Sequence, residues 1–161
     1  MGIFDTTCTD IFFPMKCDIY YATETQDKYG KMVKNWSLGN TLDCTLYTPN
    51  EKKMDDFKFE DYRFLKLDEF VVGRIKFDPR QSDVESYYPM SHILVTNIRS
   101  NGCNDQLLFF ESTETYEKKA TVFELRSCRP YIGPYSTIEY FKLVLQRSDT
   151  QELNEIAECS V

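Results

Sequence analysis

The chain has 161 residues, a formal net charge of −7 and 15% aromatic residues. This length fits one domain with its own core, and we expect a single β-rich domain over residues 1–161. The acidic excess disfavours nonspecific binding of a phosphate backbone, which needs clustered lysine and arginine. The twelve phenylalanines and eleven tyrosines favour strands over helices.

The cysteines indicate a reducing compartment. None of the six sits in a C-x-x-C pair; they are Cys8, Cys17, Cys44, Cys103, Cys128 and Cys159. The opening segment MGIFDTTCTDIFFPM is too acidic, and its apolar run too short, for a secretory signal. We therefore expect free thiols. No apolar run approaches the ~20 residues that a membrane-spanning helix needs, and we expect no membrane partner.

Strands are predicted before residue 50 at residues 17–22, 31–37 and 41–48. The polar segment TETQDKYG between the first two ends in Gly30, as a hairpin connection should. Trp36 is expected to anchor one face of the second strand. Tyr29 lies seven residues before Trp36, so Trp36 could pack either against Tyr29 across the hairpin or against the core.

A segment crowded with charges of both signs follows at residues 49–62. A loop of this length is unusual inside a compact domain and is often functional or mobile. It is either a solvated excursion or an arm that becomes ordered on a partner. Its candidate functional residues are Lys52, Lys53, Asp55, Asp56 and Lys58.

The rest of the chain predicts further short strands separated by turn signals. They are expected at residues 63–77, 92–100, 106–112, 120–127 and 137–146. Asn101-Gly102 is a strong hairpin signal. Seven or eight short strands with long loops and little helix predict a mainly β fold, either a small β-barrel or a sandwich.

The last predicted strand is apolar on both faces. The two faces are formed by Phe141, Leu143 and Leu145, and by Ile138, Tyr140 and Val144. Such a strand is central in a sheet or is covered by another subunit. The candidate interface residues are Ile138, Tyr140, Val144 and Arg147. The polar tail at 148–161 has no basic residue, and it either packs against a neighbouring protein or frays.

The sequence offers no catalytic or metal-binding constellation. The single histidine, His92, is expected in the core or at its rim. Ser91 is adjacent in sequence, but adjacent residues of a strand point to opposite faces, so the two are not expected to form a nucleophile and base pair. No local pair of cysteines begins a zinc site. We expect no enzyme activity, metal or cofactor, although counting carboxylates does not exclude a small hydrolase.

The order of segments resembles a known family. The strand CDIYYATET, a D-x-Y-G turn, a strand that closes on tryptophan and the strand TLDCTLY follow one another. The matched residues are Asp27, Tyr29, Gly30 and Trp36. The pattern is similar to that of tailed-bacteriophage head-closure proteins, also called stopper, head-completion or head–tail connector proteins. The segments HILVTNIRSNG, KKATVFELR and GPYSTIEYFKLVLQRSDTQ also resemble strands of these proteins of the phage neck.

The D-x-Y-G turn also has a physical basis of its own. The carboxylate of Asp27 can accept hydrogen bonds from backbone N–H groups ahead of it. Gly30 supplies a backbone conformation that side chains disfavour.

The resemblance implies a structural virion protein. Copies would form a ring, expected to be a hexamer, in the neck between portal or adaptor protein and tail. The subunit ring would close the head after DNA packaging and dock the tail terminator or tail tube proteins. Double-stranded DNA would pass through the lumen with weak contacts, gated by the long loop. Assembly would take place in the host cytoplasm.

Two alternatives remain open. The chain could be a tail terminator that caps the tail tube, a class that is usually α/β. It could also be a small β-rich binding module.

Overall fold

The structure is a computed structural model that describes residues 12–49, 69–82, 86–101, 105–112, 114–115 and 117–149. The described elements are β1 (Met15–Gln26), β2 (Met32–Tyr47), β3 (Phe70–Ile75), β4 (Gln81–Ser82), β5 (Ser86–Tyr87), the 3-10 turn η3 (Met90–His92), β6 (Ile93–Ser100), β7 (Phe110–Ser112), β8 (Lys118–Ala120), β9 (Phe123–Ile132) and β10 (Ile138–Arg147).

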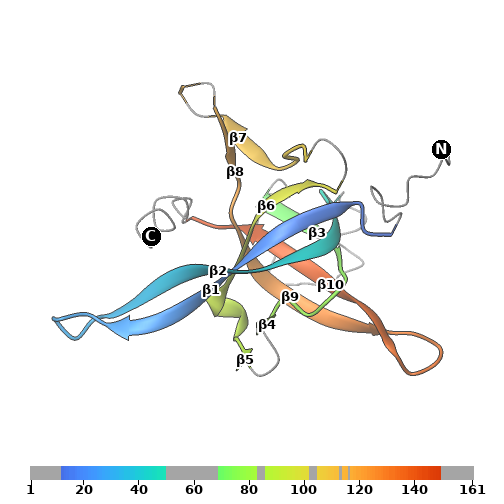
Figure 1. Ribbon diagram of the computed structural model, residues 1–161, viewed down its shortest axis with the longest axis horizontal. Coiled ribbons are helices and arrows are strands. Elements are labelled where there is room, and N and C mark those ends of the chain that lie inside the picture. The colour runs from blue at the N-terminus through green and yellow to red at the C-terminus, as the bar shows by residue number, and fades with distance from the viewer. Residues whose placement is uncertain are drawn as a thin grey trace.

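Six strands form one antiparallel sheet in the order β1–β2–β3–β10–β9–β6. Pairing of β6 with β1 closes this sheet into a barrel. The described residues include no α-helix. The predicted mainly β fold is therefore confirmed, in its closed form rather than as a sandwich. Figure 1 shows the strands crossing around a common centre.

Inward-facing side chains fill the closed sheet. Because side chains alternate between the two faces of a strand, every second residue of each long strand points into the core. The fully buried members include Cys17, Ile19, Cys44, Leu46, Ile75, Val95, Ile98, Leu143 and Leu145. Burial of each large aliphatic side chain stabilises the fold by roughly 1.5–3 kcal/mol. A second cluster joins Tyr20, Leu94 and Val122, with Trp36 packed against it.

The prediction of two strands at residues 31–37 and 41–48 was wrong, because they form the single strand β2. Gly39 keeps the strand continuous. A Cβ there would overlap the aromatic ring of Tyr21, which lies across this position. The β1–β2 register also shifts here, so Ile19 faces a bulge in β2 rather than a break.

A buried carboxylate ties three strands together where their pairing is irregular. Asp18 on β1 is 9% exposed and lies between register shifts toward both β2 and β6. It accepts hydrogen bonds from Thr41 Oγ1 (2.8 Å), Asn97 Nδ2 (2.8 Å) and Arg99 Nη1 (3.2 Å). Asn97 adopts a φ of 55°, which asparagine tolerates better than most residues. The Asp18 site is therefore a structural junction of the sheet.

Two of the later strands agree closely with prediction. The strand expected at residues 137–146 is β10, and the one at residues 92–100 is β6. The chain also returns antiparallel after β6, as the hairpin signal predicts. Leu108 donates its backbone N–H to the Ile98 carbonyl at 2.9 Å, and Arg99 bridges to Leu107.

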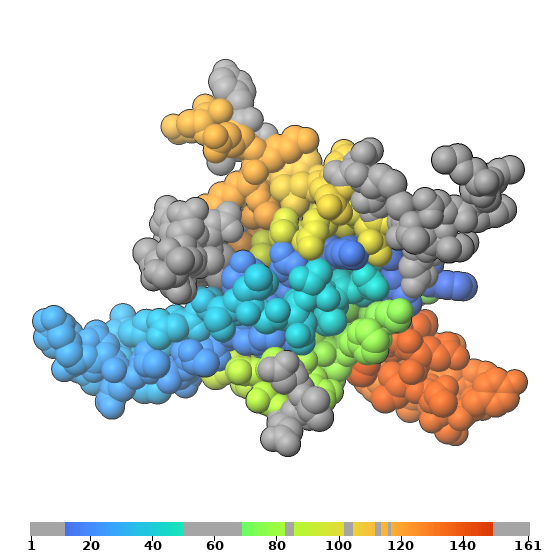
Figure 2. Space-filling view, in the orientation of Figure 1, coloured from blue at the N-terminus to red at the C-terminus, as the bar shows by residue number. Residues whose placement is uncertain are grey.

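Three hairpins extend beyond the closed sheet (Figure 1). The β1–β2 hairpin extends to one side of the view, and the β9–β10 hairpin extends to the opposite side. The short β7–β8 hairpin points away from both. In the space-filling view the two long hairpins stand out from the body as narrow projections (Figure 2).

Candidate subunit interface

The two long hairpins continue after their neighbours in the sheet have ended. β1 pairs with β6 only as far as Tyr21, so residues 23–26 pair with β2 alone. β9 pairs with β6 only at Phe123 and Glu124, and then with β10 alone. We call residues 23–35 the first arm and residues 126–140 the second arm. An isolated two-stranded hairpin is only marginally stable in water.

The turn of the first arm has the predicted geometry. The Asp27 side chain accepts a hydrogen bond from the Tyr29 backbone N–H at 3.3 Å. The Asp27 carbonyl accepts one from the Gly30 N–H at 2.8 Å, and the Asp27 N–H donates to the Lys31 carbonyl at 2.8 Å. Gly30 has a φ of 81°. The roles predicted for Asp27 and Gly30 are therefore confirmed.

Of the two predicted partners of Trp36, the structure shows the core and not Tyr29. Trp36 pairs with Ala22 near the base of the arm and packs against Tyr20 and Leu94. Tyr29 lies in the turn and is 81% exposed. Because a strand rises ~3.3 Å per residue, the four residues from Trp36 to the start of β2 already separate the two aromatic side chains by more than 10 Å. Tyr29 is therefore an exposed surface group.

Two polar contacts hold the first arm against η3. His92 Nε2 lies 2.9 Å from Glu24 Oε1. Lys34 Nζ donates to the Ser91 carbonyl at 3.2 Å. His92 thus lies at the rim of the core, one of its two predicted locations, and braces the arm.

The second arm ends in a tight turn and carries a stacked aromatic pair. Gly133 N–H donates to the Thr137 carbonyl at 2.8 Å, and Ser136, with a φ of 59°, donates its N–H to the Gly133 carbonyl at 3.1 Å. Tyr131 and Tyr140 stack with ring centroids 4.6 Å apart and planes at 6°. This cross-strand pair stiffens the arm along one face.

Both arms expose apolar and aromatic side chains. The exposed ones are Tyr29, Met32 and Val33 on the first arm, and Tyr131, Ile132, Tyr135 and Ile138 on the second. Each arm also has strand edges that pair with no other strand of the described sheet. Exposed edges and apolar side chains together are typical of a surface that pairs with another chain.

The predicted interface residues of the last strand do not lie together on one surface. Ile138 is 57% exposed at the arm tip, and Tyr140 is half-buried in the tyrosine stack. Val144 is 3% exposed and presents no surface. Arg147 forms an ion pair with Glu111 of β7 at the other end of β10.

Sequence reasoning missed most of the second arm, because it ended the strand at residue 127 whereas β9 continues to Ile132. Pro130 is the reason, since proline within a run argues against a central strand. Here β9 has lost β6 as a neighbour, so the missing N–H of Pro130 breaks no pairing on that side. The sequence signal for a longer strand was Pro130 followed by the apolar Tyr131 and Ile132 and then by a Gly-Pro turn.

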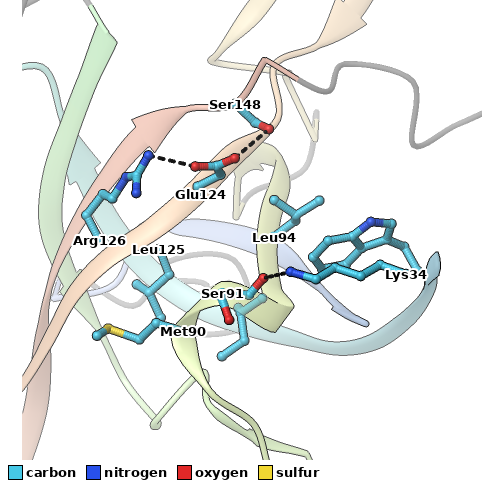
Figure 3. A pocket seen from close by; sticks show the side chains of 10 residues that line it. Lys34, Met90, Ser91, Leu94, Glu124, Leu125, Arg126 and Ser148 are labelled. Atoms are coloured by element: carbon cyan, nitrogen blue, oxygen red, sulfur yellow. Dashed lines mark hydrogen bonds and ion pairs between the residues drawn. The ribbon is translucent and has the colours of Figure 1, made fainter. Parts of the chain in front are cut away.

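A groove lies between the first arm and β9 (Figure 3). Its lining residues are Lys34, Trp36, Met90, Ser91, Ile93, Leu94, Glu124, Leu125, Arg126 and Ser148. Glu124 is held by Arg126 at 2.9 Å and by the Ser148 hydroxyl at 3.2 Å. The groove's carboxylate is thus engaged by two groups of its own chain.

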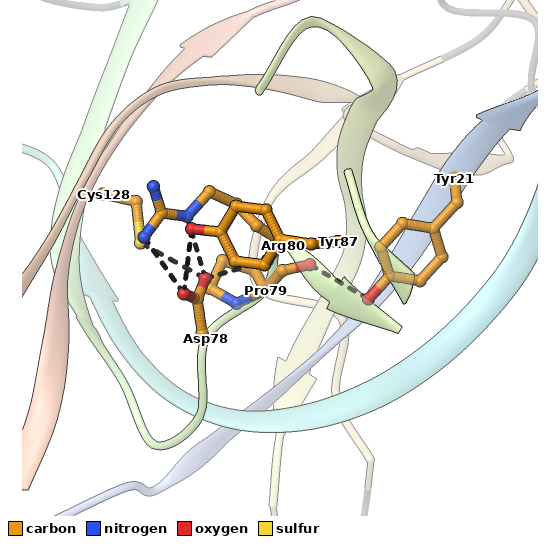
Figure 4. Close-up of polar contacts among 6 residues, drawn as sticks. All are labelled: Tyr21, Asp78, Pro79, Arg80, Tyr87 and Cys128. Carbon is orange, nitrogen blue, oxygen red and sulfur yellow. Dashed lines mark hydrogen bonds and ion pairs between the residues drawn. The ribbon is translucent and has the colours of Figure 1, made fainter. Parts of the chain in front are cut away.

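A polar cluster joins the thiol of Cys128, on the second arm, to Asp78 and Arg80 (Figure 4). Asp78 accepts two hydrogen bonds from the Arg80 guanidinium, each at 3.0 Å, and Cys128 Sγ lies 3.8 Å from Asp78 Oδ1. Burial, with the neighbouring Asp78 charge, raises the pKa of Cys128 to about 12. A thiol that stays protonated is a poor nucleophile.

Other predictions concern residues that the structure leaves undescribed or only in part. The gating candidates Lys52, Lys53, Asp55, Asp56 and Lys58 lie outside the described residues. Of the cysteines, Cys17, Cys44 and Cys128 are described, and these are free thiols. Within the described ranges no group of three or more histidine, cysteine or carboxylate side chains could hold a metal ion. The same ranges contain no helix long and apolar enough to cross a membrane.

Comparison with known proteins adds a structural similarity. No family model matches the chain, and no curated protein matches it. The solution structure of protein SF1141 from Shigella flexneri 2a is similar, with 14% sequence identity and a TM-score of 0.48. The match covers 88% of this chain and 98% of that one. At this identity and TM-score the similarity does not establish a shared fold or function.

Proposed function

We propose that this chain is a structural protein of the tailed-phage neck, which forms a ring between portal or adaptor protein and tail. The subunit ring closes the head after DNA packaging and docks the tail. The observation that carries the proposal is the pair of arms, which extend to opposite sides of a closed body and expose apolar side chains (Figure 2).

Arms on opposite sides support assembly from head to tail. A contact between two different surfaces of the same chain repeats from copy to copy, and the assembly closes into a ring when the rotation allows it. The first arm of one copy can meet the second-arm side of the next. The sequence resemblance to head-closure proteins supports the same arrangement, and it is what points to the neck.

The absence of α-helix within the described ranges supports a head-closure protein over the tail terminator, whose class is usually α/β.

The described residues are close to neutral, so the acidic excess lies in segments outside them. Duplex DNA binding by the isolated chain should be weak, with a Kd of about 10⁻⁴ M or weaker at physiological salt. Fluorescence anisotropy measures this, and tight binding with a steep salt dependence contradicts the role of a passive conduit.

The test of location is immuno-electron microscopy of virions and of separated heads and tails. Label at the head vertex beneath the portal supports the proposal. Label only on free tails indicates a tail terminator, and absence of label from virions contradicts both structural roles.

The test of the arms is assembly of the purified chain, followed by sedimentation velocity and negative-stain microscopy. Ile132→Ser with Tyr135→Ser should abolish subunit rings while leaving the melting temperature of the monomer nearly unchanged. Phe110→Ser is the matched control, because Phe110 is 41% exposed on the β7–β8 hairpin, away from both arms. Unchanged assembly of the arm variant removes the support that the arms give.

A further inference from the structure

Three basic side chains lie directly opposite one another on the outer face of the sheet. Lys142 on β10 is in register with Arg74 on β3 and with Arg129 on β9. Leu143, the next residue of β10, points into the core, so Lys142 and its two neighbours point outward. We call Arg74, Lys142 and Arg129 the basic row. Because adjacent strands lie ~4.8 Å apart, the basic row spans roughly 10 Å.

The basic row has no acidic partner within the described residues. The ion pairs there involve other cations: Arg80, His92, Arg99, Arg126 and Arg147. Like charges directly opposite across strands destabilise a sheet. An arrangement that costs stability in the monomer and lacks a counter-charge indicates a surface that receives an anion from elsewhere.

The stacked tyrosines hold two of these cations in place. The Arg74 guanidinium lies 5.4 Å from the centroid of Tyr140, and Lys142 Nζ lies 5.4 Å from that of Tyr131. Because the aromatic faces already contact each other and the cations, they are not free to stack on nucleic-acid bases. The surface therefore fits carboxylates better than an unpaired nucleic acid strand.

We propose that the basic row binds the acidic segment at residues 150–161 of a second copy of this chain. The segment contains three carboxylates, Glu152, Glu155 and Glu158, and no lysine or arginine. The number of carboxylates thus equals the number of cations in the basic row.

Chain geometry favours a second copy over the same copy. Asp149 lies seven residues beyond Lys142 along the direction of β10, up to ~23 Å from the basic row if the chain is extended. Glu152 is three residues further and reaches back at most ~11 Å. Glu155 reaches about 20 Å, so only Glu158 can return to its own basic row with slack. Binding of all three carboxylates therefore fits another copy better than the same copy.

This inference rests on the proposed function only in assuming that copies assemble; it adds which charged surfaces meet. Subunit rings that form without this contact overturn the inference and leave the proposed function intact. If the segment binds the basic row but the protein is absent from virions, the inference holds and the proposed function is contradicted.

A charge-swap experiment with full-length chains tests the pairing. The row variant carries Arg129→Glu and Lys142→Glu, and the segment variant carries Glu152→Lys, Glu155→Lys and Glu158→Lys. Each alone should weaken self-association about tenfold or more in sedimentation velocity, because it removes several ion pairs at once. An equimolar mixture should restore association, since each variant then supplies the surface that complements the other.

Combining both sets of changes in one chain should also restore association, which separates a lost contact from a misfolded variant. The matched control is Lys118→Glu with Lys119→Glu, which changes charge equally on β8, outside the basic row and outside both arms. Association that survives the row variant, or that the mixture fails to restore, overturns the proposal. Loss of duplex DNA binding by the row variant, with unchanged self-association, assigns the basic row to DNA instead.

Carbodiimide cross-linking of a mixture of isotopically light and heavy wild-type chains distinguishes the two copies. The expected product joins Lys142 of one isotopic form to Glu152 or Glu155 of the other. Cross-links found only within one isotopic form, or none from Lys142, contradict the proposed contact between copies.

Discussion

The body and the arms are built from the same strands, yet different forces hold them. In the body, alternate side chains of β1, β2, β9 and β10 are buried in one core. Beyond the body the same strands stay paired, but most of the arm side chains are exposed. Arm order thus depends on ladder hydrogen bonds, turns and a few surface contacts, which contribute little each. Regular strands without a core are therefore the part of this molecule suited to a partner.

The same substitution in the two regions should give very different costs. Asp18→Ala removes the carboxylate that joins three strands and leaves Arg99 and Asn97 without their acceptor. Its expected cost is ~3–5 kcal/mol, as for a broken buried ion pair. Asp27→Ala in the first arm removes one exposed hydrogen bond and should cost about 1 kcal/mol or less. Urea denaturation measures both, and equal costs contradict the division into body and arms.

Two glycines provide a second matched pair. A Cβ on Gly73 would overlap the Thr45 carbonyl and lie 2.9 Å from Leu46 Cα, both in the backbone of β2. Gly73→Ala should therefore cost about 3 kcal/mol, because one strand of the closed sheet must move. A Cβ on Gly133 at the second-arm turn would meet only the end of the flexible Glu139 side chain. Gly133→Ala should change stability by less than about 0.5 kcal/mol in the same measurement.

The base of the first arm marks the boundary between the two regions. Trp36 is half-buried against the second cluster, so Trp36→Ala should cost about 2 kcal/mol, roughly half the value for a fully buried aromatic side chain. Tyr29→Ala at the exposed turn should cost less than about 0.5 kcal/mol. Thermal denaturation of the two variants tests the boundary. A similar loss for both would show that the arm tip packs on the body.

Sequence reasoning succeeded where one local signal decides the structure. Alternating apolar residues located β6 and β10, and Asp27 with Gly30 located the first turn. Reasoning failed where distant residues decide. In the sequence alone, Gly39 indicates a break between two strands. In the structure, the ring of Tyr21 on β1 fills the space above Gly39, and β2 continues through it.

The interface and the Asp18 junction depend on pairing that the sequence does not display. Asp18 becomes buried only because Asn97 and Arg99 arrive from β6, about 80 residues away. Arg74, Lys142 and Arg129 become neighbours only through the registers of β3, β10 and β9. From the sequence alone, each of these three side chains is expected at a solvated surface position, and nothing indicates that they lie opposite one another.

The smallest expected effect is a gain in stability. Arg129 faces Lys142 directly, and it has no ion pair or cation–π contact within the described residues. Arg129→Thr removes this repulsion and places a good strand former at an exposed position, so the monomer should gain about 0.5 kcal/mol. Arg126→Thr on the same strand is the control. It breaks the ion pair with Glu124 and a hydrogen bond to Gln146, and should leave stability unchanged or slightly lower. Thermal denaturation at low salt, where surface charge is least screened, gives the clearest comparison of melting temperatures. A loss of stability in Arg129→Thr would mean that the basic row already has a counter-charge within its own chain.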